Sequence, residues 1–393
     1  MVTPIMRRPP LRPVVWQPPA MPDRARAGSG PRPLPPVRRL EVGGFAPEDV
    51  VVDGAGRVVT GVDDGRLLRV GPDGRVEVVA DTGGRPLGIE LLGDGRLLVC
   101  DARRGLLAVD PETSAVEVLV DRVAGAPMRF CNNAAVAADG TVYFSDSSRR
   151  FGIDHWRADL LEHSGTGRLL RLDPEASARG ASARAVEVLL DGLQFANGVA
   201  LAADESFVTV AETGAYRLTR LWLTGERAGR TDLLADNLPG FPDNLSTGAD
   251  GLIWVALGSP RNPLLDRLHR LHPVLRRAVW ALPERLQPKP VRTLWVLGRR
   301  RHRRGRARPP GPGGPLHHGD RGARARRQAL PRQPRRARRR RARPAGIGAA
   351  AMACARRVGS GRRRPCGRGR RAAPASAPPR GPAPAPPRRD ARA

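Results

Sequence analysis

The sequence predicts an all-β protein of the β-propeller type, with about five four-stranded blades encoded between residues 40 and 298. Three observations predict this fold. A strand–turn–strand unit recurs along the chain, weaker strands follow several of these units, and helical periodicity is almost absent before residue 257. Sheets repeated around a central axis are the blades of a propeller, so the recurrence sets the fold class.

The repeated unit is an apolar strand, a turn at Asp-Gly or an equivalent, and a second apolar strand, which is typical of a β-hairpin. Short apolar runs such as 66–70 and 167–172 follow as third strands, and runs such as 186–190 follow as fourth strands. The five units are PEDVVVDGAGRVVTG from Pro47, PLGIELLGDGRLLVCD from Pro86, CNNAAVAADGTVYFSD from Cys131, ANGVALAADESFVTVAE from Ala196 and PDNLSTGADGLIWVAL from Pro242.

Alignment of the units on their turns brings one polar position into register. The turn positions are Gly56, Gly95, Gly140, Glu205 and Gly251. Eight residues earlier stand Glu48, Leu87, Asn132, Asn197 and Asp243. Because the first strand of each blade lines the channel, equivalent positions on these strands should point at one spot on the axis.

The aligned oxygen-bearing residues predict a cation site with Glu48, Asn132, Asn197 and Asp243 as the metal ligands. Two carboxylates and two amide oxygens suit Ca²⁺ best, with Mg²⁺, Mn²⁺ or Zn²⁺ as alternatives. The competing interpretation is that these residues bond their own backbone at strand starts, as Asn and Asp commonly do. Four such residues at one register favour the metal site.

These residues also carry a family resemblance, which covers roughly residues 16–297. The chain resembles the regucalcin/gluconolactonase and strictosidine-synthase-like superfamily of six-bladed propellers, and most of all its bacterial strictosidine-synthase-like members. The resemblance implies the same four ligands, and it implies Asp in place of Asn133, so the charge beside Asn132 differs from the usual pattern. The matching strings are GFAPEDV, RFCNNAAVAADGTVYFSDSSRRF, HWRADLLEHSGTGRLLRLDP, FANGVAL and LPGFPDN.

Hydrolysis of a lactone or an ester is the activity that the resemblance implies, as in the lactonases and arylesterases of this superfamily. A hard cation in the channel would polarise the carbonyl and activate a water to attack it, and Asp243 would act as ligand and catalytic general base. His155 is a candidate substrate-binding residue, and His155 and His163 are candidate proton shuttles near the mouth of the channel. The alternative is that each is a surface or supporting histidine that hydrogen-bonds to the backbone. A small-molecule ester or lactone is therefore the expected substrate.

Two other functions remain open from the sequence. The first is a strictosidine-synthase-like carbon–nitrogen lyase, for which the resemblance implies a catalytic Glu late in the fold, whereas no Glu follows Glu284. The second is a truncated propeller that is weakly active or non-catalytic. Substrate-setting loops vary freely within one fold, so the sequence does not choose the substrate.

Residues 261–286 are the one segment with apolar residues at helical spacing, and Arg and His stand between them. We expect a helix inserted between blades that packs over the mouth of the channel. The alternative is weak contact of this helix with a membrane surface.

The charge of the chain is unevenly distributed. The net charge is +30, and residues 299–393 hold 31 Arg against two acids, so residues 1–298 are near neutral. We expect a Pro/Arg-rich arm over residues 1–39, the propeller over 40–298 and a disordered Arg/Pro/Gly/Ala-rich tail over 299–393. The tail resembles the product of a frameshift that removes the last blade, with a genuine basic extension as the alternative.

The remaining composition predicts no specific nucleic-acid partner and no membrane span. The tail has no aromatic residues for base stacking. No apolar run of the chain suggests a signal peptide or a transmembrane helix. Cys100, Cys131, Cys354 and Cys366 lack metal-ligand spacing, which fits a cytoplasmic protein. The oligomeric state is not readable.

Overall fold

The computed structural model describes residues 8–25, 39–173, 186–287, 291 and 295–299. All of these residues belong to the first of two structural units of the chain, Met1–Arg357. The predicted tail lies outside the described residues beyond Arg299, so its nature stays a prediction, as do the domain boundaries at residues 39 and 298.

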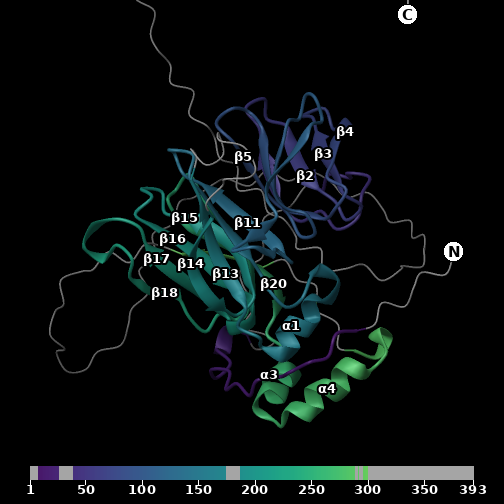
Figure 1. The fold of residues 1–393 in the computed structure, drawn as a ribbon, viewed down its shortest axis with the longest axis vertical. Coiled ribbons are helices and arrows are strands. Elements are labelled where there is room, and N and C mark those ends of the chain that lie inside the picture. The colour runs from purple at the N-terminus through teal and green to yellow at the C-terminus, as the bar shows by residue number, and fades with distance from the viewer. Residues whose placement is uncertain (1–7, 26–38, 174–185, 288–290, 292–294, 300–393) are drawn as a thin grey trace, which may run out of the picture. The chain divides into compact units, whose positions relative to one another are not determined.

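Five antiparallel sheets follow one another along the chain, and within each sheet the strands pair in sequence order (Figure 1). The prediction of a propeller with about five encoded blades is confirmed. The first four blades have four strands each. Blade one contains β1 (Val50–Val52), β2 (Val58–Gly61), β3 (Arg66–Val70) and β4 (Val76–Asp81). Blade two contains β5 (Pro86–Leu91), β6 (Leu97–Asp101), β7 (Gly105–Val109) and β8 (Val116–Val120).

A small hairpin of β9 (Arg122–Val123) and β10 (Ala126–Pro127) precedes blade three. Blade three contains β11 (Cys131–Val136), β12 (Val142–Asp146), β13 (Gly167–Leu172) and β14 (Val186–Leu193). Blade four contains β15 (Ala196–Leu201), β16 (Phe207–Glu212), β17 (Arg217–Trp222) and β18 (Thr231–Ala235). Blade five shows three strands in the described residues, which are β19 (Gly240–Thr247), β20 (Ile253–Pro260) and β21 (Trp295–Arg299).

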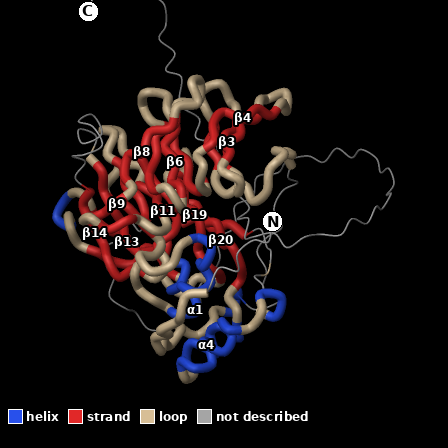
Figure 2. The backbone as a smooth tube through the Cα atoms, turned by 45° about the vertical axis from the view of Figure 1, so that its right-hand side comes forward, coloured by secondary structure: helices blue, strands red, loops and turns tan. Residues whose placement is uncertain are grey.

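The helices gather at one end of the strands (Figure 2). They are α1 (Trp156–Glu162), which lies between β12 and β13, and α3 (Pro263–Arg270) and α4 (Pro273–Ala281), which lie between β20 and β21. Short 3₁₀ turns are η1 (Asp23–Ala25), η2 (Ile153–His155), η3 (Thr213–Ala215), η4 (Gly225–Arg227) and η5 (Glu284–Leu286). No helix in the described part of the chain has the length and hydrophobicity of a membrane span.

The segment expected to form one inserted helix forms two. The Asn262 side chain accepts hydrogen bonds from the first backbone N–H groups of α3, which caps that helix. Pro273 then starts α4, because proline lacks an N–H and is tolerated only in the first turn of a helix. The His272 ring accepts from Val274 N and caps this second helix. The His-Pro pair therefore divides the segment.

The aligned turn positions have the backbone that the repeat predicts. All five have positive φ, from 53° at Glu205 to 91° at Gly95. The N–H of each donates to the carbonyl three residues earlier, as from Gly56 to Asp53 at 3.0 Å and from Gly140 to Ala137 at 3.0 Å. Glycine reaches positive φ without strain, which explains its presence at four of the five turns. The repeat alignment is thus correct in structure.

The first strands of the blades pack side by side in the order β1, β5, β11, β15 and β19. These are the inner strands of the propeller. Among the described strands, β19 and β1 end this series and share no comparable packing. The ring that the described blades build is therefore open between blade five and blade one.

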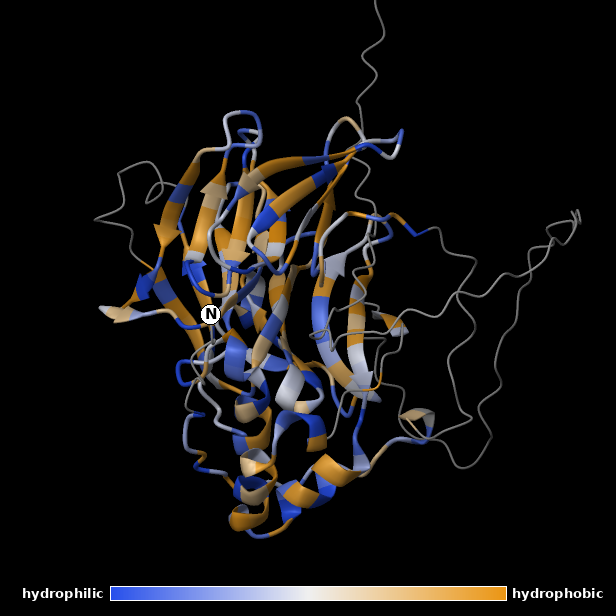
Figure 3. Ribbon diagram, turned by 90° about the vertical axis from the view of Figure 1, so that its right-hand side faces the viewer, coloured by the Kyte–Doolittle hydropathy of each residue, from blue (hydrophilic) through white to orange (hydrophobic). Residues whose placement is uncertain are grey.

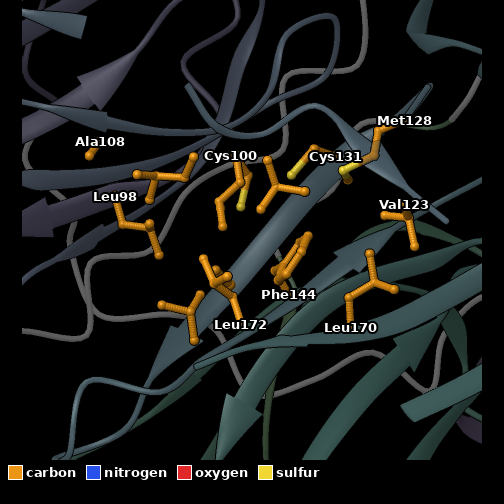
Figure 4. Close-up of a cluster of buried hydrophobic side chains, with 14 residues drawn as sticks. Leu98, Cys100, Ala108, Val123, Met128, Cys131, Phe144, Leu170 and Leu172 are labelled. Atoms are coloured by element: carbon orange, nitrogen blue, oxygen red, sulfur yellow. The ribbon is translucent and has the colours of Figure 1, made fainter. Parts of the chain in front are cut away.

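The core lies in layers between neighbouring blades, where hydrophobic side chains from facing sheets meet. Figure 3 shows that hydrophobic residues predominate along many of the strands. Figure 4 shows one such layer, in which Leu98 and Cys100 of blade two face Phe144 and Leu170 of blade three. All four side chains are fully buried. Each large aliphatic or aromatic side chain buried in this way contributes roughly 1.5–3 kcal/mol, so the interfaces between blades hold the fold together.

Residues 8–20, the N-terminal arm, form no helix or strand and run along the helices. Side chains of the helices and nearby loops donate hydrogen bonds to the backbone carbonyls of the arm. Trp280 Nε1 donates to Pro9 O at 2.9 Å, and Arg276 Nη2 donates to Val14 O at 2.8 Å. Further along, Arg261 Nη2 donates to Pro19 O at 2.8 Å. The N-terminal arm thus straps α1, α3 and α4 into one cap.

Candidate metal centre

The five aligned inner-strand positions all line one cavity of about 470 Å³. The structure brings Glu48, Asn132, Asn197 and Asp243 together there, with Leu87 as the fifth position. All four polar side chains are buried. The register read from the sequence therefore converges in space.

A β-bulge interrupts each inner strand from blade two to blade five at the aligned position. The register of the strand pairs shifts between Pro86 and Ile89, between Cys131 and Ala134, between Ala196 and Val199, and between Pro242 and Leu245. A bulge adds one residue to one strand and redirects a side chain. The bulges explain why side chains from four successive blades point into one cavity.

Hydrogen bonds donated by their Nδ2 atoms fix the orientation of the Asn132 and Asn197 amide groups. Asn132 Nδ2 donates to Ser147 Oγ at 2.8 Å, and Asn197 Nδ2 donates to Asp243 Oδ1 at 2.7 Å. Both Oδ1 atoms are buried and have no hydrogen-bond partner among the described residues. Burying an oxygen without a partner costs free energy. Coordination of a cation such as Ca²⁺ by the amide oxygen would remove this cost.

Asp243 is the buried carboxylate that accepts the hydrogen bond from Asn197. Burial raises its pKa to about 6, and the hydrogen bond from Asn197 opposes this rise. A Cβ at Gly258 would lie 2.7 Å from Asp243 Oδ2, so glycine leaves room for the carboxylate. An ionised Asp243 is costly in this site unless a positive charge offsets its desolvation.

Glu48 is the second carboxylate, and the guanidinium of Arg85 lies beside it. The distance between Arg85 Nη2 and Glu48 Oε2 is 3.8 Å, and Arg85 also donates to Ala46 O at 2.9 Å. Arg85 is buried and lines the cavity. Sequence reasoning missed Arg85. The available signal was an arginine directly before the inner strand of blade two.

The contacts of Asn133, the residue after the candidate ligand Asn132, were not predicted from the sequence. Asn133 Nδ2 donates to Asp49 Oδ2 at 3.2 Å, and Asn133 Oδ1 accepts from Val199 N at 2.8 Å. A Cβ at Gly88 would lie 2.7 Å from Asn133 Cα, so only glycine lets Asn133 cross blade two to reach blade one. This amide therefore ties blades one, three and four together without a metal.

The donor set fits a hard cation. It consists of two carboxylates and two amide oxygens, which is the chemistry that Ca²⁺ prefers. No group of three or more His, Cys, Asp or Glu side chains forms a metal site anywhere in the described ranges. Of the alternatives, Zn²⁺ fits least, because its sites use mostly Cys and His.

The two histidines lie apart from these residues. His155 is not among the residues that line the cavity, although its neighbours Asp154 and Trp156 are. Its ring contacts Trp280 with 6.2 Å between ring centroids. His163 is buried under the arm, stacked on Trp16 at 4.2 Å. The structure therefore gives neither histidine a place beside the candidate ligands.

The walls of the cavity are mainly apolar. Phe130, Phe195 and Phe241 come from the blades. The cap adds Leu264, Leu265, Leu268 and Val279. The segment expected to cover the channel mouth thus contributes directly to the cavity.

His163 makes the cap sensitive to acid. Burial, with Arg276 and Arg217 nearby, lowers its pKa to about 4 from an ordinary 6.5. The folded state then binds fewer protons than the unfolded state, so stability is lost as the pH falls from about 6.5 towards 4.

We expect His163→Asn to remove this loss, which amounts to about 3 kcal/mol at most. Asn suits the positive φ of 60° at this residue. Melting temperatures of both proteins between pH 7 and 4 test the prediction, because the buried carboxylates and the neighbouring His269, whose pKa burial lowers to about 3, are present in both. Parallel curves would contradict it.

The fold and this site define the class: a β-propeller protein with a candidate cation site in a cavity beneath a helical cap. Sequence models of two families match, one described as "Strictosidine synthase" at residues 132–226 and one described as "Strictosidine synthase-like, N-terminal" at residues 34–70. Protein STRICTOSIDINE SYNTHASE-LIKE 10 of Arabidopsis thaliana is 35% identical over 278 residues, which cover 65% of this chain and 71% of that protein. The chain belongs to the strictosidine synthase-like family.

Other relatives align over shorter parts of their length. The adipocyte plasma membrane-associated protein of Rattus norvegicus is 35% identical over 243 residues, which cover 57% of this chain and 62% of the relative. Protein STRICTOSIDINE SYNTHASE-LIKE 13 of Arabidopsis thaliana is 37% identical over 201 residues, which cover 51% of this chain and 48% of the relative. The chain thus spans about half to three fifths of these two proteins.

A gluconolactonase from Xanthomonas campestris is similar in structure. It is 23% identical, has a TM-score of 0.46, and the match covers 55% of this chain and 71% of that chain.

Proposed function

We propose that this protein is a calcium-dependent hydrolase of esters or lactones, with Glu48, Asn132, Asn197 and Asp243 as the calcium ligands. One observation carries the proposal. Two buried amide oxygens without partners and two buried carboxylates meet in one cavity, from four different blades. A bound Ca²⁺ would supply Lewis-acid chemistry to the carbonyl of a substrate and to water.

The side chains would share the remaining work. Asn197 Nδ2 holds Asp243 Oδ1, which leaves Oδ2 as the atom that would take a proton from water. A positioned carboxylate within reach of a water can act as its general base. The phenyl rings of Phe130 and Phe195 would exclude bulk water and hold the apolar part of the substrate.

A second candidate is a carbon–nitrogen lyase that condenses an amine with an aldehyde, since both matching family models are named after strictosidine synthase. The late catalytic Glu that the resemblance implies for this activity has no counterpart among the described residues that line the cavity. Glu284, the last Glu of the chain, is exposed and pairs with Arg157 at 3.0 Å. This observation favours hydrolysis over condensation.

The test is hydrolysis of phenyl acetate and of a panel of five- and six-membered lactones by the full chain. We expect turnover with Ca²⁺, loss of turnover with a chelator, and recovery when Ca²⁺ is added back. An arylethylamine with an aldehyde forms the second arm of the assay. Absence of hydrolysis at saturating Ca²⁺ would refute the hydrolase, and condensation would establish the lyase.

A further inference from the structure

The cap carries an unusual concentration of exposed apolar side chains. Of fourteen large hydrophobic residues that are exposed in the described ranges, eight lie on the cap and its strap. We call this set the cap face. It consists of Val14, Val15, Leu264, Leu271, Val274, Leu275, Leu282 and Leu286.

Helix α4 packs Val279 and Trp280 inward, and it also carries apolar side chains on its outward side. Its Arg276 side chain is fully buried, whereas Val274 is 51% exposed and Leu275 is 41% exposed. Arg276 donates to Leu161 O at 3.0 Å and to Val14 O at 2.8 Å, so the inward arginine is a fixed part of the cap. A helix of a globular protein normally turns its apolar side inward, and an outward apolar face marks an interaction site.

Exposed cations share the segment that carries most of the cap face. Arg267, Arg270, Arg277 and Arg285 are exposed on the same segment. Of the two acids there, Asp266 is buried and paired with Arg261 at 2.8 Å, and Glu284 is paired with Arg157. The surface around the apolar residues is therefore positively charged.

We propose that the cap face docks on a lipid bilayer that contains anionic phospholipids. Apolar side chains would enter the boundary between headgroups and acyl chains, and the arginines would lie among the phosphates. Docking of two cap faces in a dimer would bring these arginines against one another, which disfavours a second copy as the occupant. Leu264 is 51% exposed and also lines the cavity, so docking places the cavity mouth at the bilayer.

The experiment is flotation of the full chain with unilamellar vesicles of phosphatidylcholine containing about 30% phosphatidylglycerol. Leu275→Glu combined with Leu282→Glu alters the cap face. Val78→Glu combined with Val188→Glu is the matched control, because both valines are exposed on blades, at 55% and 40%. The Arg-rich segment 300–393 is present in every variant, so its electrostatic binding is common to all of them.

We expect the cap-face variant to bind vesicles at least tenfold more weakly than the wild type, and the control variant to bind as the wild type does. The difference should persist in ~0.5 M NaCl, which screens the tail but not apolar insertion. Equal binding by all three proteins, with native circular dichroism, would overturn the proposal. A wild-type dimer that the cap-face substitutions convert to monomer, with vesicle binding unchanged, would overturn it in favour of a second copy.

Discussion

Asp243→Asn is expected to abolish calcium binding and hydrolysis while leaving the fold intact. The amide oxygen of Asn can still accept the hydrogen bond from Asn197, so only the charge is lost. Substitution of residues that merely orient a metal ligand typically costs 10–100-fold in affinity, so loss of a ligand charge should cost more than ~100-fold. Calorimetric titration with Ca²⁺ measures this loss directly.

The same substitution should raise the stability of the calcium-free protein. Burial lifts the pKa of Asp243 from 3.8 to about 6, so stability is lost as the pH rises from about 3.8 to 6, and the full cost is present above pH 6. A neutral Asn removes this cost, which is worth up to about 3 kcal/mol at pH 7. The wild type should therefore melt lower than the variant in chelator and gain stability when Ca²⁺ is added, whereas the variant should not respond to Ca²⁺.

Asp250→Asn is the matched control, since Asp250 is exposed in the turn that follows the same inner strand. Its Oδ1 accepts from Leu252 N at 3.0 Å, and the Asn oxygen can keep that bond. The control should bind Ca²⁺ as the wild type does. A calcium-induced rise in melting temperature that survives Asp243→Asn would contradict the assignment of this ligand.

Arg276→Ala is expected to be the most destabilising single change in the cap. The guanidinium is fully buried, and its removal leaves the carbonyls of Leu161 and Val14 without donors. A buried polar group without a partner costs about 1–3 kcal/mol, and the void left by the side chain adds to this cost. We expect a loss of at least ~3 kcal/mol in the free energy of unfolding.

Arg277→Ala provides the comparison at the next position. Arg277 is exposed and makes one hydrogen bond to the arm, from Nε to Leu11 O at 3.2 Å. Its loss should change stability by roughly 0.5 kcal/mol or less, as for most surface substitutions. Urea denaturation of both variants measures the difference, and equal losses would mean that the buried guanidinium does not hold the cap.

The repeat could be predicted from the sequence because each hairpin needs the same backbone conformation at its turn. A tight turn needs a residue that tolerates positive φ, so Gly56, Gly95, Gly140 and Gly251 mark equivalent points. Counting back from the turn then fixed the face of each inner strand. The same count predicts that Asn132 and Asp243 point at one spot, and in the structure both line one cavity.

Features that depend on neighbouring blades were not readable. The link from Asn133 to Asp49 joins residues 84 positions apart, and it needs the close approach that Gly88 permits. The ion pair of Arg85 with Glu48 likewise forms between two blades. His155 is a candidate substrate-binding residue from the sequence, but in the structure it ends the 3₁₀ turn Ile153–His155 and its ring lies against Trp280.

The bulges were missed for a related reason. Strand alternation predicts that successive side chains point to opposite faces, and a single extra residue breaks this rule. The dipeptides at the bulges are Leu-Gly, Asn-Asn, Asn-Gly and Asp-Asn. Small or amide-bearing second residues at every one of these positions were the available signal.

The way in which the N-terminal arm is held affects which of its residues can change in evolution. The donors of Trp280, Arg150, Arg277, Arg276, Arg270, Arg261 and Asn237 all reach main-chain carbonyls of residues 9–20. Carbonyl groups are the same in every amino acid, so the exposed side chains of the arm are free to vary while its path is kept, whereas Leu11 and Trp16 are held by packing. Orthologues should therefore preserve the length of this segment and the arginines that donate to it. The arm residues themselves should be less conserved than these arginines.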